Sequence, residues 1–270
     1  MSSNNLHRLE CTEVWGGNEA IRKTVTIPGM RGALFCKPCL SATGGDVYYL
    51  TNCTEGIMSR IFLADVVGHG SAVAKVSNWL HEVLKGTINV MDPTNVLREL
   101  NHHVVRQGFD SLTTVAGMSF AWHTYELEFG YAGHPPILYK PRRSETWRTL
   151  TVDNLSKHQV RNIVLGVKDG VPFDIGRMHV RPGDRIFVYS DGLVEARSQR
   201  GEFFGEQRVI DLLNAEGTAE PEAVLDILSR AVTAHVDSEH WHHDDVTMIL
   251  QEVRDQEERP SYPKELALAV

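Results

Sequence analysis

Four short segments of the sequence place an aspartate beside glycine or at the end of an apolar run. In two of them a run that should form a buried strand, 61–64 or 186–189, leads into a carboxylate, Asp65 or Asp191, and then into a turn. A charge at the end of a buried strand is costly unless a cation neutralises it. The segments are Gly44-Gly45-Asp46, Asp65-Val66-Val67-Gly68-His69-Gly70, Ser190-Asp191-Gly192 and Asp244-Asp245-Val246-Thr247.

Convergence of these aspartates would create a site for divalent metal. Carboxylates that share a small volume repel one another, which raises their pKa values and opposes folding unless metal is bound. Hard oxygen ligands select Mg²⁺ or Mn²⁺ over zinc. Two such ions roughly 3.5 to 4 Å apart can lower the pKa of a shared water and clamp phosphate oxygens for in-line attack. Each segment alone also fits an ordinary turn, because Asp-Gly and Gly-Asp pairs favour turns.

Hydrophobic periodicity predicts the elements that would position these residues. Strands are followed by two helices, and that order then repeats once before a final strand. Two blocks of strands and two blocks of helices predict an α+β fold of two packed sheets with helices outside them. The polar stretch 141–172 predicts a surface excursion. The predicted strands are 24–27, 33–40, 47–51, 60–65, 113–122, 126–131, 137–140, 185–190 and 245–251, and the predicted helices are 72–85, 92–104, 205–214 and 221–236.

Composition narrows the class of protein further. A chain of 270 residues with 42% hydrophobic residues can bury a substantial core, and a single domain is the simplest interpretation. The formal charge of −8 argues against nucleic acid or an anionic membrane as a partner. Residues 1–10 lack the apolar stretch of a signal peptide, and no apolar run approaches the roughly 18 residues needed to span a bilayer. We therefore expect a cytoplasmic protein.

Further motifs accompany the four acidic segments in a fixed order. They are Tyr131-Ala132-Gly133-His134-Pro135-Pro136, Gly183-Asp184, Leu193-Val194-Glu195-Ala196-Arg197 and Phe203-Phe204-Gly205. Over about residues 33–253 the ordered set resembles the metal-dependent protein serine/threonine phosphatases of the type 2C (PPM) family, specifically its SpoIIE-like bacterial branch. The resemblance implies a four-layer α-β-β-α sandwich: two central, mostly antiparallel sheets flanked by helix pairs, with a dimetal site at one end of the sheets.

The resemblance also assigns roles to individual positions. Asp65 is similar to the ligand that bridges both metals and would be a catalytic residue, and the backbone carbonyl of Val66 would be a further ligand. Asp191 and Asp244 resemble the carboxylates on the first metal, and Asp46 the one on the second metal's side. The implied cofactors are two or more Mn²⁺ or Mg²⁺ ions.

Some residues next to these ligands are expected to support them, and for His69 two roles remain open. Asp245 and Gly192 are expected to support the ligands without binding metal. His69 could protonate the leaving oxygen as a general acid, or it could simply be a turn residue that caps the following helix. The sequence departs from the branch at Tyr49, where relatives often carry another aspartate, and it offers no clear counterpart of the N-terminal phosphate-binding arginine of the eukaryotic enzymes. Phosphate binding would then rest chiefly on the metals.

The family implies hydrolysis of phosphoserine or phosphothreonine on a protein by a dimetal-activated water. By analogy with the branch, the substrate could be an anti-sigma-factor antagonist in bacterial partner-switching signalling. Two alternatives remain: a catalytically inactive phosphatase-fold binding module and a small-molecule phosphomonoesterase. The presence of all four candidate ligand aspartates favours an enzyme over the binding module.

The expected domain organisation is an N-terminal extension over 1–30 that packs partly on the domain, a phosphatase domain over 31–253 and a flexible tail over 254–270. Because the resemblance begins near residue 33, we expect no room for a fused sensor domain. Control would then come from expression, from a regulatory protein partner or from movement of the two helices after Asp65. We expect the segment 72–107 to be the regulatory face.

Overall fold

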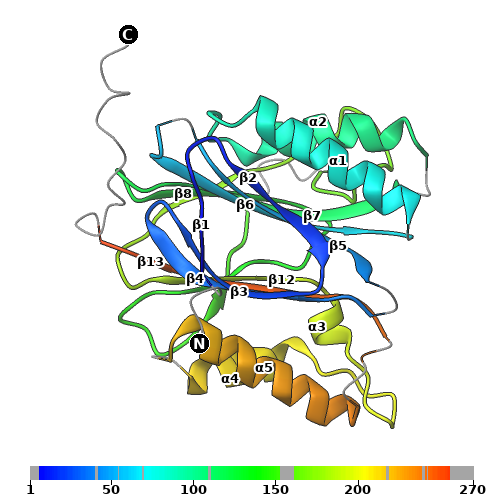
Figure 1. The fold of residues 1–270 in the computed structure, drawn as a ribbon, viewed down its shortest axis with the longest axis vertical. Helices are drawn as coiled ribbons and strands as arrows, with labels where there is room; N and C mark the ends of the chain where they lie inside the picture. Colours follow the sequence, from blue (N-terminus) through cyan, green and yellow to red (C-terminus); the bar gives the residue numbers. More distant parts are fainter. Residues whose placement is uncertain are drawn as a thin grey trace.

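The structure is a computed structural model of the chain, and it describes residues 6–39, 42–53, 55–68, 70–108, 111–152, 161–216, 219–238, 241 and 243–255. The described residues form four layers: a helix pair, a six-stranded sheet, a seven-stranded sheet and a second helix pair (Figure 1). This arrangement confirms the predicted α+β sandwich with helices outside two packed sheets. No described helix is long and apolar enough to cross a membrane.

The first sheet is antiparallel throughout and carries two of the four aspartate segments. Its neighbouring strands β5 and β6 hold Asp46 and Asp65. In spatial order it consists of β11 (Gly176–His179), β8 (Glu126–Ala132), β7 (Thr113–Ala121), β6 (Met58–Val66), β5 (Thr43–Asn52) and β2 (Val14–Glu19).

The second sheet carries the other two aspartate segments at the ends of β12 and β13. All of its neighbouring strands pair antiparallel except β1 and β3, which are parallel. Residues before 31, expected to be an extension, supply strands to both sheets. In spatial order the second sheet consists of β1 (Leu6–Arg8), β3 (Ile21–Ile27), β4 (Met30–Lys37), β13 (Val246–Val253), β12 (Arg185–Tyr189), β9 (Leu138–Lys140) and β10 (Arg148–Thr149).

Four long helices cover the outer faces of the sheets. Pairs α1–α2 and α4–α5 lie on opposite sides of the sandwich, and the short α3 follows β12 (Figure 1). Asp92 caps α2 by accepting a hydrogen bond from the Thr94 amide at 2.8 Å, as its position before Pro93 predicts. The helices are α1 (Ser71–Gly86), α2 (Pro93–Val105), α3 (Gly192–Glu195), α4 (Glu206–Ala215) and α5 (Pro221–Val236).

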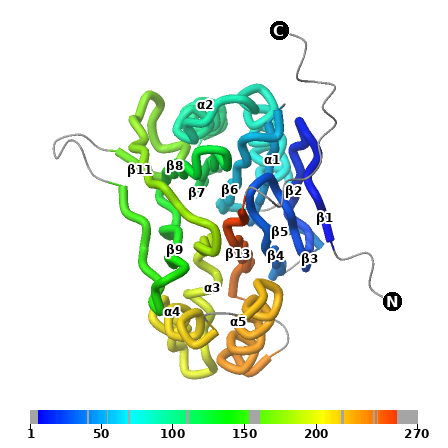
Figure 2. The backbone as a smooth tube through the Cα atoms, turned by 90° about the vertical axis from the view of Figure 1, so that its left-hand side faces the viewer, coloured from blue at the N-terminus to red at the C-terminus, as the bar shows by residue number. Residues whose placement is uncertain are grey.

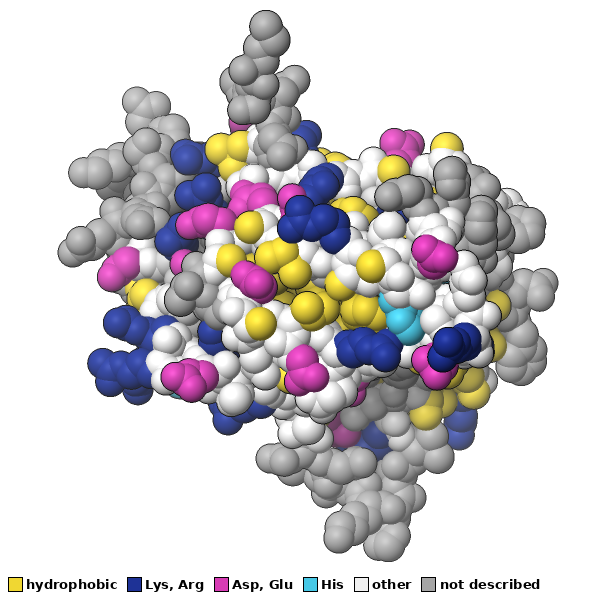
Figure 3. Space-filling model, turned by 90° about the horizontal axis from the view of Figure 1, so that it is seen from below, with side chains coloured by type: hydrophobic (Ala, Val, Ile, Leu, Met, Phe, Trp, Pro, Cys, Tyr) yellow, Lys and Arg dark blue, Asp and Glu magenta, His cyan; other side chains and the backbone are white. Residues whose placement is uncertain are grey.

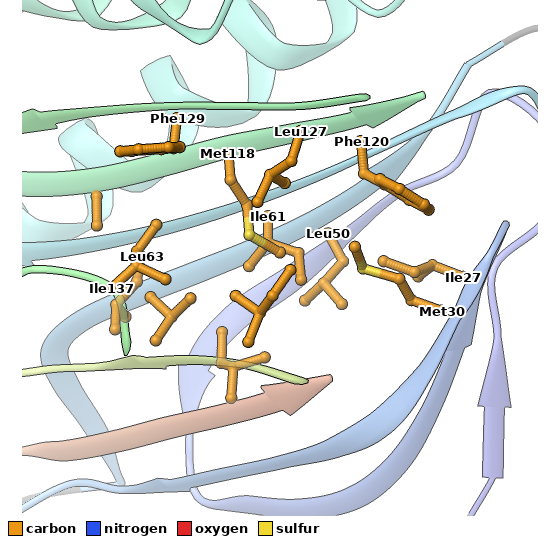
Figure 4. Close-up of a cluster of buried hydrophobic side chains, with 14 of the residues drawn as sticks. Ile27, Met30, Leu50, Ile61, Leu63, Met118, Phe120, Leu127, Phe129 and Ile137 are labelled. Carbon is orange, nitrogen blue, oxygen red and sulfur yellow. The ribbon is translucent and has the colours of Figure 1, made fainter. Parts of the chain in front are cut away.

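Strand periodicity divides the apolar side chains between the inner core and the helix layers. On β6, Ile61 and Leu63 point into the cluster between the sheets, whereas Phe62 and Ala64 pack under α1 and α2. Both faces of this strand are therefore buried, which holds its end and Asp65 in place. Figure 4 shows the cluster between the sheets, which includes Ile27, Met30, Leu50, Ile61, Leu63, Met118, Phe120, Leu127, Phe129 and Ile137.

The outer layers are fastened by apolar packing and by one buried arginine. Leu213 of α4 and Leu228 of α5 pack against Phe187 of the second sheet. Seen from the α4–α5 side, hydrophobic side chains lie across the middle of this face among charged ones (Figure 3). On the opposite side, Arg60 is 1% exposed and donates to the Leu84 carbonyl at 2.8 Å, so its guanidinium satisfies the C-terminal end of α1.

The sequence did not predict five short elements: β1, β2, β10, β11 and α3. Each of these strands is short or lies at a sheet edge, where partners distant in sequence decide whether a strand forms. Viewed from the side, β9 and β11 lie at one edge of the sandwich and β1 and β2 at the other (Figure 2). Within the predicted excursion 141–172, the structure describes 141–152 and 161–172 and finds only the two-residue strand β10.

Candidate active site

The first pair of aspartates is positioned by strand register. Asp46 of β5 lies directly opposite Asp65 of β6 in the antiparallel pairing. Directly opposed residues have Cβ atoms about 4.5 to 5.5 Å apart, and like charges at such positions repel. Asp46 is 2% exposed, so its carboxyl group lies in the interior between the sheets. These two segments, each of which alone also fits an ordinary turn, meet at the same end of the first sheet.

The second pair is brought together by β12 and β13. The strands pair up to Tyr189 opposite Met248, and the contact then continues beyond them. The Ser190 amide donates to the Thr247 carbonyl at 3.0 Å, and the Thr247 amide donates to Ser190 Oγ at 2.9 Å. Asp191 begins α3 and Asp244 precedes β13, so both leave neighbouring strands at the same end of the second sheet.

Asp245 ties the two sheets together at this end. Its carboxylate accepts hydrogen bonds from the Cys39 amide at 2.7 Å and from the Gly45 amide, so it holds the chain between β4 and β5. A Cβ atom on Gly44 would lie 2.5 Å from Asp245 Oδ2. Glycine is therefore needed at position 44 because the backbone approaches this carboxylate too closely for a side chain, and at position 45 a Cβ atom would lie 2.9 Å from the Val66 carbonyl oxygen.

The electrostatics show that the acidic groups share one environment. Burial raises the pKa of Asp65 to about 7, and the negative charges of Asp191 and Asp244, followed by those of Asp245 and Glu195, contribute to the same shift. The pKa values of Asp191 and Asp244 are also raised, in both cases chiefly by burial. At neutral pH the described chain thus brings together carboxylates that oppose one another's ionisation.

Asp46 is the most deeply buried member of the group. Burial, followed by the charge of Asp65, raises its pKa well above the usual value, and the nearby side chains of Ser190 and Thr247 oppose the rise. Its Oδ2 atom is buried without a hydrogen-bond partner among the described residues. An orphaned carboxylate oxygen in the interior is costly and is suited to a cation.

The donor set fits hard divalent cations by its chemistry, because it consists of buried carboxylate oxygens. In the described part of the chain, however, no group of three or more His, Cys, Asp or Glu side chains is already arranged around one metal position. The backbone therefore brings the carboxylates to one region, and the coordination itself would require side-chain adjustment.

Two histidines near the site, His134 and His243, lie among the described residues. His69 lies outside the described residues, as do His240 and His242. His243 Nε2 lies 2.9 Å from the Gly192 carbonyl, so it ties the loop before β13 to the start of α3. His134 is buried, and burial lowers its pKa to about 3.

His134 also connects to the site through one residue. Its Nδ1 atom lies 2.7 Å from the Thr114 hydroxyl oxygen, and Thr114 is the residue of β7 that pairs with Asp65. Thr114 therefore lies between this neutral imidazole and Asp65: it contacts His134 through its hydroxyl group and pairs with Asp65 on the neighbouring strand.

Sequence reasoning missed three side chains of the site: Ser190, Thr247 and Glu195. The side chains of Ser190 and Thr247 lower the pKa of Asp46, and the charge of Glu195 raises the pKa of Asp191. A signal for Glu195 was present, since it stands four residues after Asp191 at the start of a helix, where such residues share one face.

Comparison with solved structures identifies the fold as that of the type 2C (PP2C) protein phosphatases: the SiaA-PP2C domain of Pseudomonas aeruginosa aligns with a TM-score of 0.67 at 18% identity, over 82% of this chain and 85% of that one. The RsbU and RsbW domains of Rv1364c from Mycobacterium tuberculosis align with a TM-score of 0.67 at 23% identity, over 87% of this chain and 63% of that one. The SpoIIE (stage II sporulation protein E) family model matches residues 58–254. The chain belongs to the SpoIIE family.

Two curated proteins share parts of the sequence. Protein IcfG of Synechocystis sp. is 35% identical over 125 residues, which is 46% of this chain and 18% of IcfG. Phosphoserine phosphatase RsbU of Bacillus subtilis is 26% identical over 160 residues, which is 58% of this chain and 44% of RsbU. The chain thus covers less than half the length of either relative. Phosphatases of this class are in general metal-dependent.

Proposed function

We propose that this chain is a metal-dependent protein serine/threonine phosphatase. The observation that carries the proposal is the shared environment of Asp65, Asp191 and Asp244, whose strand ends meet at one end of the two sheets in a member of the SpoIIE family. Opposed carboxylates with raised pKa values in one small region are expected where a divalent cation normally neutralises them.

The residues proposed to hold metal are Asp46, Asp65, Asp191, Asp244 and the backbone carbonyl of Val66. We propose two or more Mn²⁺ or Mg²⁺ ions, because hard carboxylate oxygens prefer them. When bound, such ions supply a water of lowered pKa and positive charge for the phosphate oxygens. The charges of Asp191, Asp244, Asp245 and Glu195 all act on Asp65, and we propose it as the ligand shared between ions.

Other side chains of this chain keep these carboxylates in place. The Ser190 and Thr247 side chains, which come from the second sheet, counteract the raised pKa of Asp46 on the first sheet. Asp245 fixes the backbone at Gly45 and Cys39, and we propose that it supports the ligands without binding metal. Gly192 allows α3 to begin against the Asp244–Asp245 backbone, where a Cβ atom would collide. His69 as general acid remains a proposal from the sequence.

The proposed substrate is a protein that carries phosphoserine or phosphothreonine. Support comes from the family and from the partial similarity to a phosphoserine phosphatase. The specific candidate is a phosphorylated anti-sigma-factor antagonist in a bacterial partner-switching pathway, which rests on analogy with the branch. We also propose a regulatory protein partner that acts on the face formed by α1 and α2. Lys75, Asn78 and Glu82 are exposed there, and substitutions at these positions should alter partner binding or activity.

The proposal is tested by phosphate release from a phosphoserine peptide with Mn²⁺, with Mg²⁺ and with chelator. We expect metal-dependent turnover that Asp191→Asn lowers by at least about a hundredfold. Asp211→Asn, which changes an exposed carboxylate on α4, should leave turnover unchanged. No turnover from a folded protein with either metal would favour a binding module, and much faster turnover of small phosphorylated metabolites would favour a small-molecule phosphomonoesterase.

A further inference from the structure

The edge of the sandwich formed by β10 and β11 carries a groove that the proposed active site does not use. β10 ends the seven-stranded sheet and β11 ends the six-stranded sheet. Two cavities of about 270 and 290 Å³ lie between them, and both are lined by Arg148 of β10 and Met178 of β11. We call the two cavities together the edge groove.

The edge groove is strongly basic in a chain whose formal charge is −8. The first cavity is lined by exposed guanidinium groups and an exposed imidazole, and the second adds Arg177. Arg177 is paired with Glu128. Within the described ranges, none of the four arginines of the first cavity forms an ion pair with a carboxylate. The basic residues of the first cavity are Arg142, Arg143, Arg148, His179 and Arg181.

One buried carboxylate organises the loops that present these arginines. Asp184 is 2% exposed and accepts hydrogen bonds from the Arg142 amide at 2.7 Å, the Arg181 amide at 2.8 Å and the Tyr139 hydroxyl at 2.5 Å. Its oxygens are thus engaged by backbone and phenol and not by guanidinium groups. Arg148 lies 5.2 Å from the Tyr139 ring centre. Asp184 therefore fixes the backbone from which the side chains of Arg142 and Arg181 extend.

The groove lies away from the metal-binding aspartates. Strand β12 runs from Arg185, next to Asp184, to Tyr189, just before Ser190 and Asp191. Five residues of strand span roughly 15 to 17 Å. A ligand in the edge groove would therefore occupy a second site on the same molecule.

The shape and chemistry of the groove favour one class of occupant. Guanidinium groups bind carboxylates through paired hydrogen bonds, and two adjoining cavities offer room for several residues in a row. Terminal strands also present backbone groups to which an extended peptide can add. We propose that the edge groove binds an extended, acidic segment of a partner protein. This inference holds whether or not the partner is a phosphatase substrate.

Binding can be measured without catalysis. The probe is a fluorescein-labelled peptide of about ten residues that alternates glutamate and threonine, long enough to span both cavities. We expect fluorescence anisotropy to show saturable binding by the full chain that weakens as salt rises. The double variant Arg143→Glu/Arg148→Glu should lose at least about tenfold in affinity. The matched control Arg200→Glu/Arg230→Glu, which reverses two exposed arginines elsewhere, should change affinity by less than about twofold.

Several outcomes would overturn the proposal. Equal loss in both double variants would indicate nonspecific attraction, and no binding by the folded wild-type chain would remove the site. Saturable binding of inorganic phosphate without the peptide would mean a small-anion site. If the peptide bound only after Glu257→Gln/Glu258→Gln, the chain's own C-terminal residues would be the occupant. Circular dichroism of each variant separates these results from unfolding.

Discussion

Neutralising Asp65 should stabilise the metal-free protein and remove its response to divalent metal. The pKa of this carboxyl group is raised from 3.8 to about 7, first by burial and then by its acidic neighbours. The folded state therefore holds the proton more tightly than the unfolded state, so stability from this group is lost as pH rises from about 3.8 through about 7.

The magnitude follows from the size of the shift. A difference of one pKa unit corresponds to about 1.4 kcal/mol, so Asp65 opposes folding by about 4 kcal/mol at pH 8, where it is ionised in both states. At pH 5 the cost is about 2 kcal/mol, because the carboxylate must take up a proton on folding. These values are upper bounds, because the side chain is not fully buried and solvent screens part of the interaction. Asp65→Asn removes the ionisable group and its pH dependence together.

The assay is urea unfolding of wild type and Asp65→Asn at several pH values in chelator. We expect the variant to be more stable by about 2 to 4 kcal/mol at pH 8, with the difference narrowing toward pH 5. Added Mn²⁺ or Mg²⁺ should reverse the order, because a ligand that binds only the folded wild type stabilises it by mass action. Asp211→Asn is the control and should change stability by less than about 0.5 kcal/mol.

Two results would refute this reasoning. The first is a metal-free Asp65→Asn protein that is less stable than wild type at pH 8. The second is a stability difference that does not change with pH. Either would mean that Asp65 does not sit among ionised carboxylates in the folded chain, and the argument for a metal site at this end of the sheets would fail with it.

Three further tests follow from the contacts. Gly44→Ala should push Asp245 aside and lower metal affinity, measured by calorimetry, and turnover, measured by phosphate release, by at least about tenfold. The control Gly17→Ala, where a Cβ atom would meet nothing within 4 Å, should change neither quantity. Equal losses in the two variants would contradict this prediction. Arg60→Ala should lower the free energy of unfolding in urea by about 3 kcal/mol, because it opens a cavity and orphans the Leu84 carbonyl; a loss below about 1 kcal/mol would show that the buried guanidinium does not fasten α1. Raising the pH from 6 to 8 in metal-free buffer should lower the thermal midpoint of wild type more than that of Asp65→Asn, and parallel curves would argue against the raised pKa.

The parts of the fold that the sequence predicted are those whose signal is local. On β6 alternate apolar side chains face the two sides of a strand buried on both faces, and α5 repeats its apolar residues at helical spacing. The two-residue strand β10 and the parallel pairing of Leu6–Arg8 with β3 carry no such signal. They form because a partner distant in the sequence lies beside them, and single-sequence patterns do not contain that information.

In the candidate site, too, some features have a local sequence signal and others depend on residues distant in the chain, as Asp244 and Asp245 show. Turn chemistry singled out both residues, but it could not say which would face the other acidic segments. The structure separates them by the contacts of their neighbours. The charges of both residues act on Asp65, but Asp245 accepts from the backbone amides of Cys39 and Gly45, which come from another part of the chain, whereas Asp244 accepts from the adjacent Asp245 amide. Both oxygens of Asp245 are engaged by amides, which suits a clamp between the sheets, and we propose Asp244 as the residue of the pair that binds a cation. The resemblance implied these two roles, but the contacts behind them depend on the approach of Gly44 and Gly45 from the other sheet, some two hundred positions earlier in the chain, so turn chemistry alone does not contain them.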